Sequence, residues 1–164
     1  MRWGLCVCCL LLASRADASD INWTIPVGVN LGFGLHKTPV PTGGILGAEA
    51  SLVFVAMTES KFFTLPTFWG GAYVDALWDT AAGRGRASIG PEVGYMIFGV
   101  DGGVVAQAGG GPVRLGGCVR PMLTIGILSL YVRLTFVPSD PEVDETTEIG
   151  LLIKYPFSKN NNWL

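Results

Sequence analysis

One stretch of the sequence, WTIPVGVNLGFGL at residues 23–35, alternates strictly between two kinds of side chain. Its odd positions hold large apolar residues, and its even positions hold small or polar ones such as glycine, threonine and asparagine. A β-strand sends successive side chains to opposite faces, whereas a helix repeats about every 3.6 residues. The stretch therefore predicts a long strand with one apolar face and one small or polar face.

The same alternation recurs in seven further segments of the chain. We expect eight strands in all, at residues 23–35, 45–57, 68–79, 88–97, 98–107, 115–125, 128–136 and 147–157. Each is near the length of about 9–11 residues that a tilted strand needs to cross a bilayer. The second segment fits least well, because Val53, Val55 and Met57 fall on its polar face. This misfit predicts a β-bulge or a local apolar patch.

Charged residues fall on one face of these segments. When the apolar faces point outward, the inward charges are Glu49, Asp75, Asp79, Glu92, Asp101, Arg120, Arg133, Glu148 and Lys154. A narrow barrel of about eight strands leaves room inside only for side chains, and buried charges of opposite sign must pair. We therefore predict a charge network in the lumen formed by Glu49, Asp75, Glu92, Asp101, Arg120, Arg133 and Lys154. It is interpreted as structural pairing or, alternatively, as a path for protons or ions.

The composition excludes two classes of protein and disfavours a third. The 164 residues include 23 glycines, only 15% are charged, and the mean hydropathy is +0.45. A net charge of −2 with high apolar content excludes disorder, and 11 basic against 13 acidic residues exclude an electrostatic nucleic-acid binder. Glycine in helix interiors costs about 1 kcal/mol each, which disfavours a helical bundle. The predicted fold is a single closed eight-stranded antiparallel up-and-down transmembrane β-barrel, because a closed barrel satisfies every backbone group in hydrocarbon.

Aromatic residues and connection lengths support the membrane interpretation. One set of segment ends carries Trp23, Phe68, Tyr95, Phe98, Tyr155 and Phe157, and the other set carries Phe33, Trp78 and Phe136. Two aromatic belts, with short turns at one rim and longer loops at the other, are typical of outer-membrane barrels. The short turns are expected around residues 96–98 and 126–127, and the longer loops at residues 36–44, 80–87, 108–114 and 137–146; the connection at residues 58–67 is long for the short-turn rim. The alternative is that the aromatic residues pack into a core.

The start of the chain is predicted to be a secretory signal peptide, residues 1–18. Arg2 precedes an apolar run at residues 4–13, which is too short to cross a bilayer as a helix, and small residues surround a cut after Ala18. Cleavage there removes three of the four cysteines and leaves Cys118, which we expect to be a buried thiol. A weaker alternative is lipid attachment at Cys8 or Cys9. The barrel domain then covers residues 19–157, followed by a short polar tail at residues 158–164.

The last predicted strand carries a resemblance to a known class of proteins. Residues 148–155, EIGLLIKY, read polar, any, glycine, any, any, apolar, any, aromatic. This resembles the C-terminal assembly signal of bacterial outer-membrane β-barrels, and residues 21–157 resemble the small eight-stranded OmpA/OmpX architectural type. The signal residues would be Glu148, Gly150, Ile153, Tyr155 and Phe157, although here the chain continues to Leu164. The resemblance implies a bacterial outer-membrane location, contact with outer-membrane lipid, and recognition by the barrel-assembly machinery, which adds the strand to its own sheet edge.

Residues with catalytic chemistry are few. His36 is the only histidine and is predicted to be a solvated loop residue, with no serine or carboxylate close in sequence. The acidic segment at residues 137–146 lacks the glycine and ligand spacing of an EF-hand. We therefore predict no catalytic residue, no metal site and no cofactor.

The sequence thus favours a non-enzymatic outer-membrane barrel without a wide pore, with a structural role or with loops that meet an unidentified external partner. One alternative is a lipid-modifying enzyme of the outer membrane, since some eight-stranded barrels use a histidine with a serine and an acid. That alternative requires His36 to lie near a serine or an acid at the outer rim. Another alternative is a secreted soluble barrel that binds an apolar ligand, which requires the large apolar residues to point inward.

Overall fold

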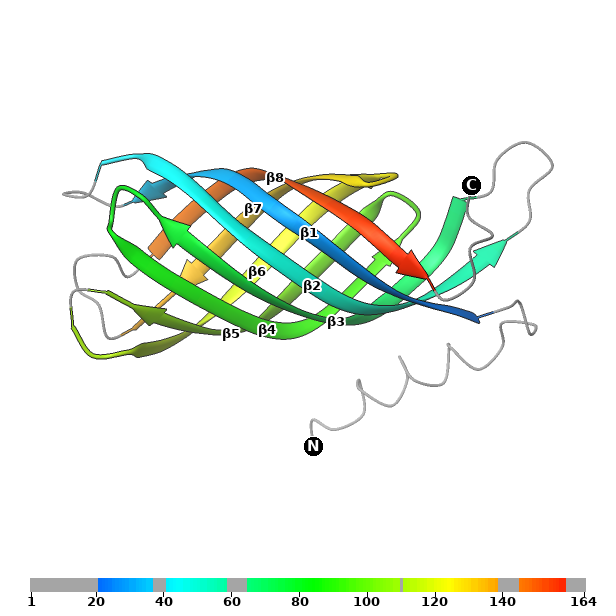
Figure 1. Ribbon diagram of the computed structural model, residues 1–164, viewed down its shortest axis with the longest axis horizontal. Coiled ribbons are helices and arrows are strands. Elements are labelled where there is room, and N and C mark those ends of the chain that lie inside the picture. Colours follow the sequence, from blue (N-terminus) through cyan, green and yellow to red (C-terminus); the bar gives the residue numbers. More distant parts are fainter. Residues whose placement is uncertain (1–20, 37–40, 59–64, 110, 139–144, 159–164) are drawn as a thin grey trace, which may run out of the picture.

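The computed structural model describes residues 21–36, 41–58, 65–109, 111–138 and 145–158. Eight strands make up most of them: β1 Ile21–His36, β2 Gly43–Thr58, β3 Leu65–Asp79, β4 Arg84–Tyr95, β5 Phe98–Ala108, β6 Arg114–Ile125, β7 Leu128–Phe136 and β8 Glu145–Ser158. Each strand pairs antiparallel with the next, and β8 pairs with β1 to close the barrel (Figure 1). The prediction of a closed eight-stranded up-and-down barrel is therefore confirmed.

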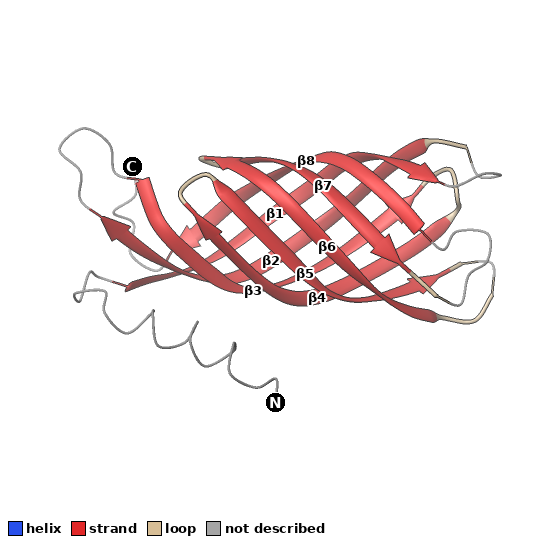
Figure 2. Cartoon of the chain, turned by 180° about the vertical axis from the view of Figure 1, so that it is seen from behind, coloured by secondary structure: helices blue, strands red, loops and turns tan. Residues whose placement is uncertain are grey.

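All regular elements in the described part of the chain are strands (Figure 2). No helix among those residues is long and apolar enough to span a bilayer. The predicted signal peptide at residues 1–18, with Cys6, Cys8 and Cys9, lies outside the described residues, as do most of the tail after Phe157 and the middle of the acidic segment.

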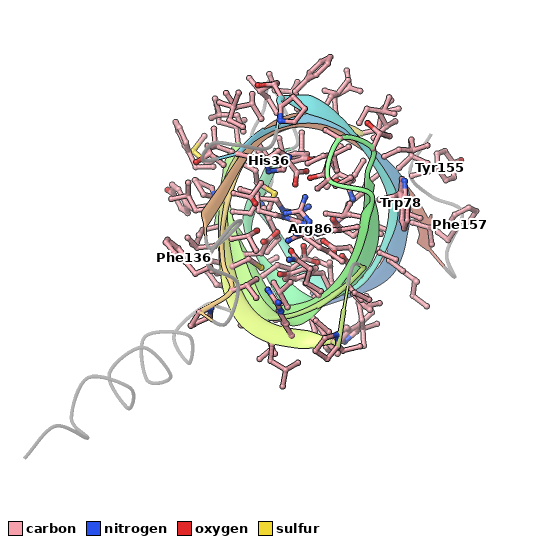
Figure 3. The ribbon with its side chains drawn as sticks, turned by 90° about the vertical axis from the view of Figure 1, so that its left-hand side faces the viewer. His36, Trp78, Arg86, Phe136, Tyr155 and Phe157 are labelled. Atoms are coloured by element: carbon pink, nitrogen blue, oxygen red, sulfur yellow. The ribbon has the colours of Figure 1, made fainter. Side chains whose placement is uncertain are left out.

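The two faces of the barrel wall differ as the alternation predicts. Val29 and Leu130 are 46% and 56% exposed on the outside, whereas Arg120 and Glu148 are fully buried inside. Figure 3, which looks along the barrel, shows Arg86 within the ring of strands and aromatic side chains such as Phe136, Tyr155 and Phe157 outside it. The large apolar side chains therefore lie on the outer surface, and the ionic ones lie in the lumen.

The connections between strands lie at the two ends of the barrel; the one between β2 and β3, at residues 59–64, lies outside the described residues. Tight two-residue turns occur at residues 96–97 and 126–127, and we call this end the turn rim. The connections at residues 37–42, 80–83, 109–113 and 137–144 mark the opposite end, the loop rim. At the turn rim Gly126 has a φ of 61°, a left-handed conformation that glycine adopts at no steric cost. The start of β1 and the end of β8 both lie at the turn rim, at the right of Figure 1.

Two predicted strand starts differ from the structure by three residues or more: β3 begins at Leu65 and not at Phe68, and the error is larger for β4. β4 begins at Arg84 and not at Ser88, so the preceding connection is a short turn and not a loop of eight residues. The reason is Asp79, whose Oδ1 accepts hydrogen bonds from the backbone N–H groups of Ala81 (3.1 Å) and Ala82 (3.0 Å). An aspartate that bonds its own backbone two residues on is a turn former, and it lets β3 and β4 pair up to the rim.

The misfit in the second segment has a structural counterpart. The register between β2 and β3 shifts between Ala56 and Met57, as expected for a bulge. Val53 points into the lumen and is only 6% exposed, so an apolar patch is present as well. Both features lie toward the turn rim.

The lumen at the turn rim is filled by apolar side chains. Met122, Tyr131 and Leu152 form a buried cluster, and Trp69 packs against it. Gly94 makes room for the indole, since a Cβ at this position would lie 2.1 Å from the Trp69 ring. This apolar cluster packs on the turn-rim side of the charged residues.

Candidate functional site in the barrel lumen

The structure places the seven predicted network residues on the inner wall. Six are buried, and the side chain of Lys154 is 15% exposed: Glu49, Asp75, Glu92, Asp101, Arg120, Arg133 and Lys154. Their ion pairs do not join all seven residues into one network. Five of them, Glu49, Glu92, Asp101, Arg120 and Lys154, form a group in the middle of the barrel that we call the central charge ring.

Arg120 of β6 joins two carboxylates of the central charge ring. Its Nε and Nη2 lie 2.7 and 2.5 Å from Asp101 Oδ2, and its Nη1 donates to Glu49 Oε2 at 2.6 Å. Asp101 sits directly opposite Arg120 in the β5–β6 register, whereas Glu49 reaches it across the lumen from β2. Every nitrogen of this guanidinium therefore lies close to a carboxylate oxygen, and Nε and Nη1 donate hydrogen bonds.

Lys154 of β8 joins Glu49 to the third carboxylate. Its Nζ lies 2.5 Å from Glu49 Oε1, 3.1 Å from Glu92 Oε2 and 2.8 Å from Ser51 Oγ. Gly28 of β1 is the register partner of both Lys154 and Glu49. Because Gly28 has no side chain, the ammonium and the carboxylate can meet across β1.

Two tyrosine rings hold the Arg120 guanidinium in place. Its Cζ lies 5.3 Å from the ring centroids of both Tyr73 and Tyr131. A cation over an aromatic face is attracted by the ring, more so when both are desolvated. Ion pairs and rings together occupy the centre of the lumen.

Above the central charge ring, toward the loop rim, two further ion pairs cross the lumen. Arg133 of β7 pairs with Asp75 of β3, whose other oxygen accepts a hydrogen bond from Ser88. Arg86 of β4 pairs with Glu148 of β8, with Nη2 3.2 Å from Oε2. Each pair is balanced in charge, which limits the cost of burying it.

Arg86 was not among the predicted network residues. The boundary at Ser88 left it in a loop, although the alternation itself extends back to residue 86 with the same parity as Ser88 and Glu92. That parity was the signal that could have identified it. Its partner Glu148 was predicted to point inward, and it also accepts a hydrogen bond from the Tyr131 hydroxyl.

His36 is the last residue of β1 and not a solvated loop residue, so that expectation is wrong. Its side chain is fully buried, and its Nε2 lies 3.0 Å from Oδ2 of Asp79, which is 3% exposed. Both strands continue up to the loop rim with these positions on the inner face, which brings the two side chains together. His36 and Asp79 are far apart in the sequence, so the sequence did not indicate that they form a pair.

The residues of the predicted assembly signal lie on both faces of β8. Glu148 points inward, while Tyr155 and Phe157 lie outside with ring centroids 5.1 Å apart and Ile153 is half-buried. A Cβ at Gly150 would lie 2.5 Å from the Tyr131 hydroxyl oxygen. The glycine of this pattern therefore has a packing role within the barrel.

Other potential chemistry in the described part of the chain is limited. Cys118 is a buried free thiol whose Sγ lies 3.3 Å from the Tyr73 hydroxyl. Within the described ranges, no group of three or more His, Cys, Asp and Glu side chains is arranged to hold a metal ion.

No known protein family matches the chain, and no curated protein or solved structure is significantly similar to it. The assignment of a function therefore depends on the geometry of the barrel wall and of the lumen.

Proposed function

We propose that the protein is an integral β-barrel of the bacterial outer membrane with a closed lumen, and that it serves a structural role or presents its loops to an external partner. The observation that carries the proposal is the distribution of charge on the wall. Large apolar side chains cover the outer surface, while every charged residue whose side chain is described is buried or half-buried. A soluble barrel would show the opposite arrangement, because water solvates charges and not apolar side chains.

The height of the apolar wall matches a bilayer. On β1 the exposed rings of Trp23 and Phe33 are ten residues apart, and on β3 the exposed rings of Phe68 and Trp78 have the same spacing. Ten residues at about 3.3 Å each, tilted by about 40°, span a height of about 25 Å. Outer-membrane barrels carry an apolar band of about 25 Å between their aromatic girdles.

At the turn rim the aromatic rings touch one another. The ring centroids of Trp23 and Phe54 are 5.7 Å apart, and those of Phe54 and Phe68 are 6.1 Å apart. With the Tyr155–Phe157 pair, these rings form part of a belt around one end of the barrel. Amphipathic and aromatic rings favour the interface between hydrocarbon and headgroups.

The filled lumen supports a closed barrel over a porin. The central charge ring fills the middle level, and Trp69 with its apolar cluster fills the level nearer the turn rim. A barrel of eight strands is just wide enough for side chains to occupy its interior. A role in contacting partners therefore belongs to the loop rim.

The proposal is tested by topology mapping in cells. Two single-cysteine variants are made in a Cys118→Ala background: Gly111→Cys at the loop rim, where a side chain meets open space, and Ile127→Cys in a turn at the opposite rim. A membrane-impermeant maleimide should label residue 111 on intact cells, and residue 127 only after the outer membrane is permeabilised. The protein should also migrate faster unheated than heated in detergent gels. Recovery in the soluble fraction, or equal labelling of both sites on intact cells, would refute the proposal.

A lipid-modifying enzyme is the second candidate, because the acid that it requires beside His36 is present at the loop rim. Asp79 could orient the imidazole as a general base, as an acid does in hydrolytic triads. Thr80 follows Asp79, and its hydroxyl donates to the Gly44 carbonyl at 2.8 Å. The full burial of His36 places this candidate second, because substrate would have no access to the imidazole in this conformation.

The enzymatic candidate is tested with radiolabelled outer-membrane lipid in mixed micelles. An enzyme should release or transfer acyl chains, and His36→Ala should lower the rate at least about 100-fold, the scale of a lost general base. Asp75→Asn, which alters an ion pair deeper in the lumen, is the matched control. Absence of activity in the unmodified protein would eliminate this candidate. The soluble, ligand-binding alternative is disfavoured already, since the large apolar residues point outward.

A further inference from the structure

The central charge ring does not balance in charge. It contains three carboxylates, Glu49, Glu92 and Asp101, but only two cations, Arg120 and Lys154. The contacts run in order from Glu92 to Lys154, to Glu49, to Arg120 and to Asp101. Each of these four steps joins opposite charges, and the one remaining step, from Asp101 back to Glu92, joins two acids.

That remaining step is short in the fold. Glu92 of β4 and Asp101 of β5 are register partners, so their side chains emerge side by side on the inner wall. Both residues are only 2% exposed, and one oxygen of each, Glu92 Oε1 and Asp101 Oδ1, has no hydrogen-bond partner. Like charges directly opposite in a sheet repel, and a buried ionised oxygen without a partner is costly.

The neighbouring cations are paired with other acceptors, and their buried nitrogens that make no hydrogen bond, Arg120 Nη2 and Arg133 Nε, do not donate to either oxygen. Arg120 donates from Nε to Asp101 Oδ2 and from Nη1 to Glu49 Oε2, and its Nη2 lies close to the same Asp101 oxygen. Lys154 contacts three oxygens, on Glu49, Glu92 and Ser51. The charged and titratable groups around the pair come from five other strands: Glu49 (β2), Tyr73 (β3), Arg120 (β6), Arg133 (β7) and Lys154 (β8). Arg133 is paired with Asp75, and Tyr73 bonds Cys118, so none of these groups satisfies the two oxygens.

We propose that Glu92 and Asp101 bind one proton between them, held on the two otherwise unpartnered oxygens. Two carboxyl groups that share a buried site cannot both ionise readily, and one retained proton removes the repulsion and supplies a hydrogen bond. The proton makes the central charge ring neutral and makes the contact between Asp101 and Glu92 attractive. The lumen thus contains a proton-binding site, which lies inside the barrel whatever surrounds the outer wall.

Infrared spectroscopy of the folded protein in detergent tests this proposal directly. At neutral pH the unmodified protein should show the carbonyl stretch of a protonated carboxylic acid, and the band should shift in D₂O. Glu92→Gln and Asp101→Asn should each abolish the band, because the remaining acid then ionises beside an amide donor. Asp79→Asn, at the loop rim, is the matched control and should retain it. A missing band in the unmodified protein, or a band that survives both Glu92→Gln and Asp101→Asn, would overturn the proposal.

The dependence of stability on pH provides a second readout. The folded barrel would hold one proton that the unfolded chain releases near neutral pH, so its unfolding equilibrium constant should rise with pH by up to about tenfold per unit until that proton is lost. The Glu92→Gln variant should lack this rise of the unfolding equilibrium constant with pH when it is compared with the unmodified protein. Replacing sodium chloride by choline chloride separates a proton from a bound metal cation. A several-fold destabilisation in choline, with no carboxylic acid band, would show that a cation occupies the pair and would refute the proton.

Discussion

The position of a lysine along the outer wall provides the sharpest test of the membrane proposal. Val132 is the central residue of β7, four residues from Leu128 and four from Phe136, and it points outward. Four residues at about 3.3 Å each, tilted by about 40°, place it about 10 Å in height from either end of the strand. This puts residue 132 near the middle of the proposed hydrocarbon layer.

We expect Val132→Lys to cost about 2–4 kcal/mol, the range for a lysine on the lipid face at the bilayer midplane. Since every 1.4 kcal/mol is a factor of ten, the unfolding equilibrium constant should rise about 30-fold to 700-fold. Ile125→Lys, at the turn-rim end of β6, should cost only about 0–1 kcal/mol, because the ammonium can reach the interface. Arg133→Lys should also cost less than Val132→Lys, since its charge remains in the lumen.

The assay is reversible urea unfolding in lipid vesicles, followed by tryptophan fluorescence and by the heat-dependent shift on gels. The comparison is informative because Ile125 is 73% exposed and Val132 is 38% exposed, so both side chains lie on the surface. In water, neither surface lysine should change stability by more than about 0.5 kcal/mol. Equal tolerance of Val132→Lys and Ile125→Lys in vesicles would refute the assignment of the outer wall to lipid.

Three further predictions concern the lumen. Arg120→Met should lower the unfolding free energy by about 3–5 kcal/mol because it leaves Glu49 and Asp101 without their shared cation, and Arg120→Lys should restore part of it in the same urea titration. Gly94→Ala should cost about 1–3 kcal/mol, because its Cβ would overlap the Trp69 ring; a double-mutant cycle with Trp69→Leu should recover most of the loss, and simple additivity would contradict the contact. Cys118 should resist maleimide in the folded barrel and react fully in urea, because its thiol is buried. Mass spectrometry of a chain that begins after residue 18 measures the modification, and equal rates in both states would show that the thiol is not buried.

Much of the barrel wall could be read from the alternation of residues. Residues 128–136 were predicted with the boundaries that β7 has, because Leu128 and Phe136 lie between a glycine turn and a proline-containing loop. The start of β4 was missed because residues 80–87 were assigned to a loop, whereas β4 begins at Arg84. His36 was misplaced for the same reason, since a strand that continues to the rim cannot be distinguished locally from the beginning of a loop.

The contacts of the lumen could not be obtained in this way. The alternation assigned Glu49, Arg120 and Lys154 to one face. It does not predict which side chains on that face contact each other across a closed barrel. Those contacts depend on the stagger of the strands, which brings residues distant in sequence to the same height in the barrel. The contact of Lys154 with Glu49 across Gly28 arises only once β8 has paired with β1.

The amino-acid sequence by itself determined which side of each strand is apolar and which side carries the charges, because a period of two is a local property of the extended backbone. Only the tertiary structure decided which charges pair, that Trp69 packs at the turn-rim level, and that Glu92 and Asp101 stand together with one unpartnered oxygen each. These are properties of closure and register, which depend on all eight strands at once.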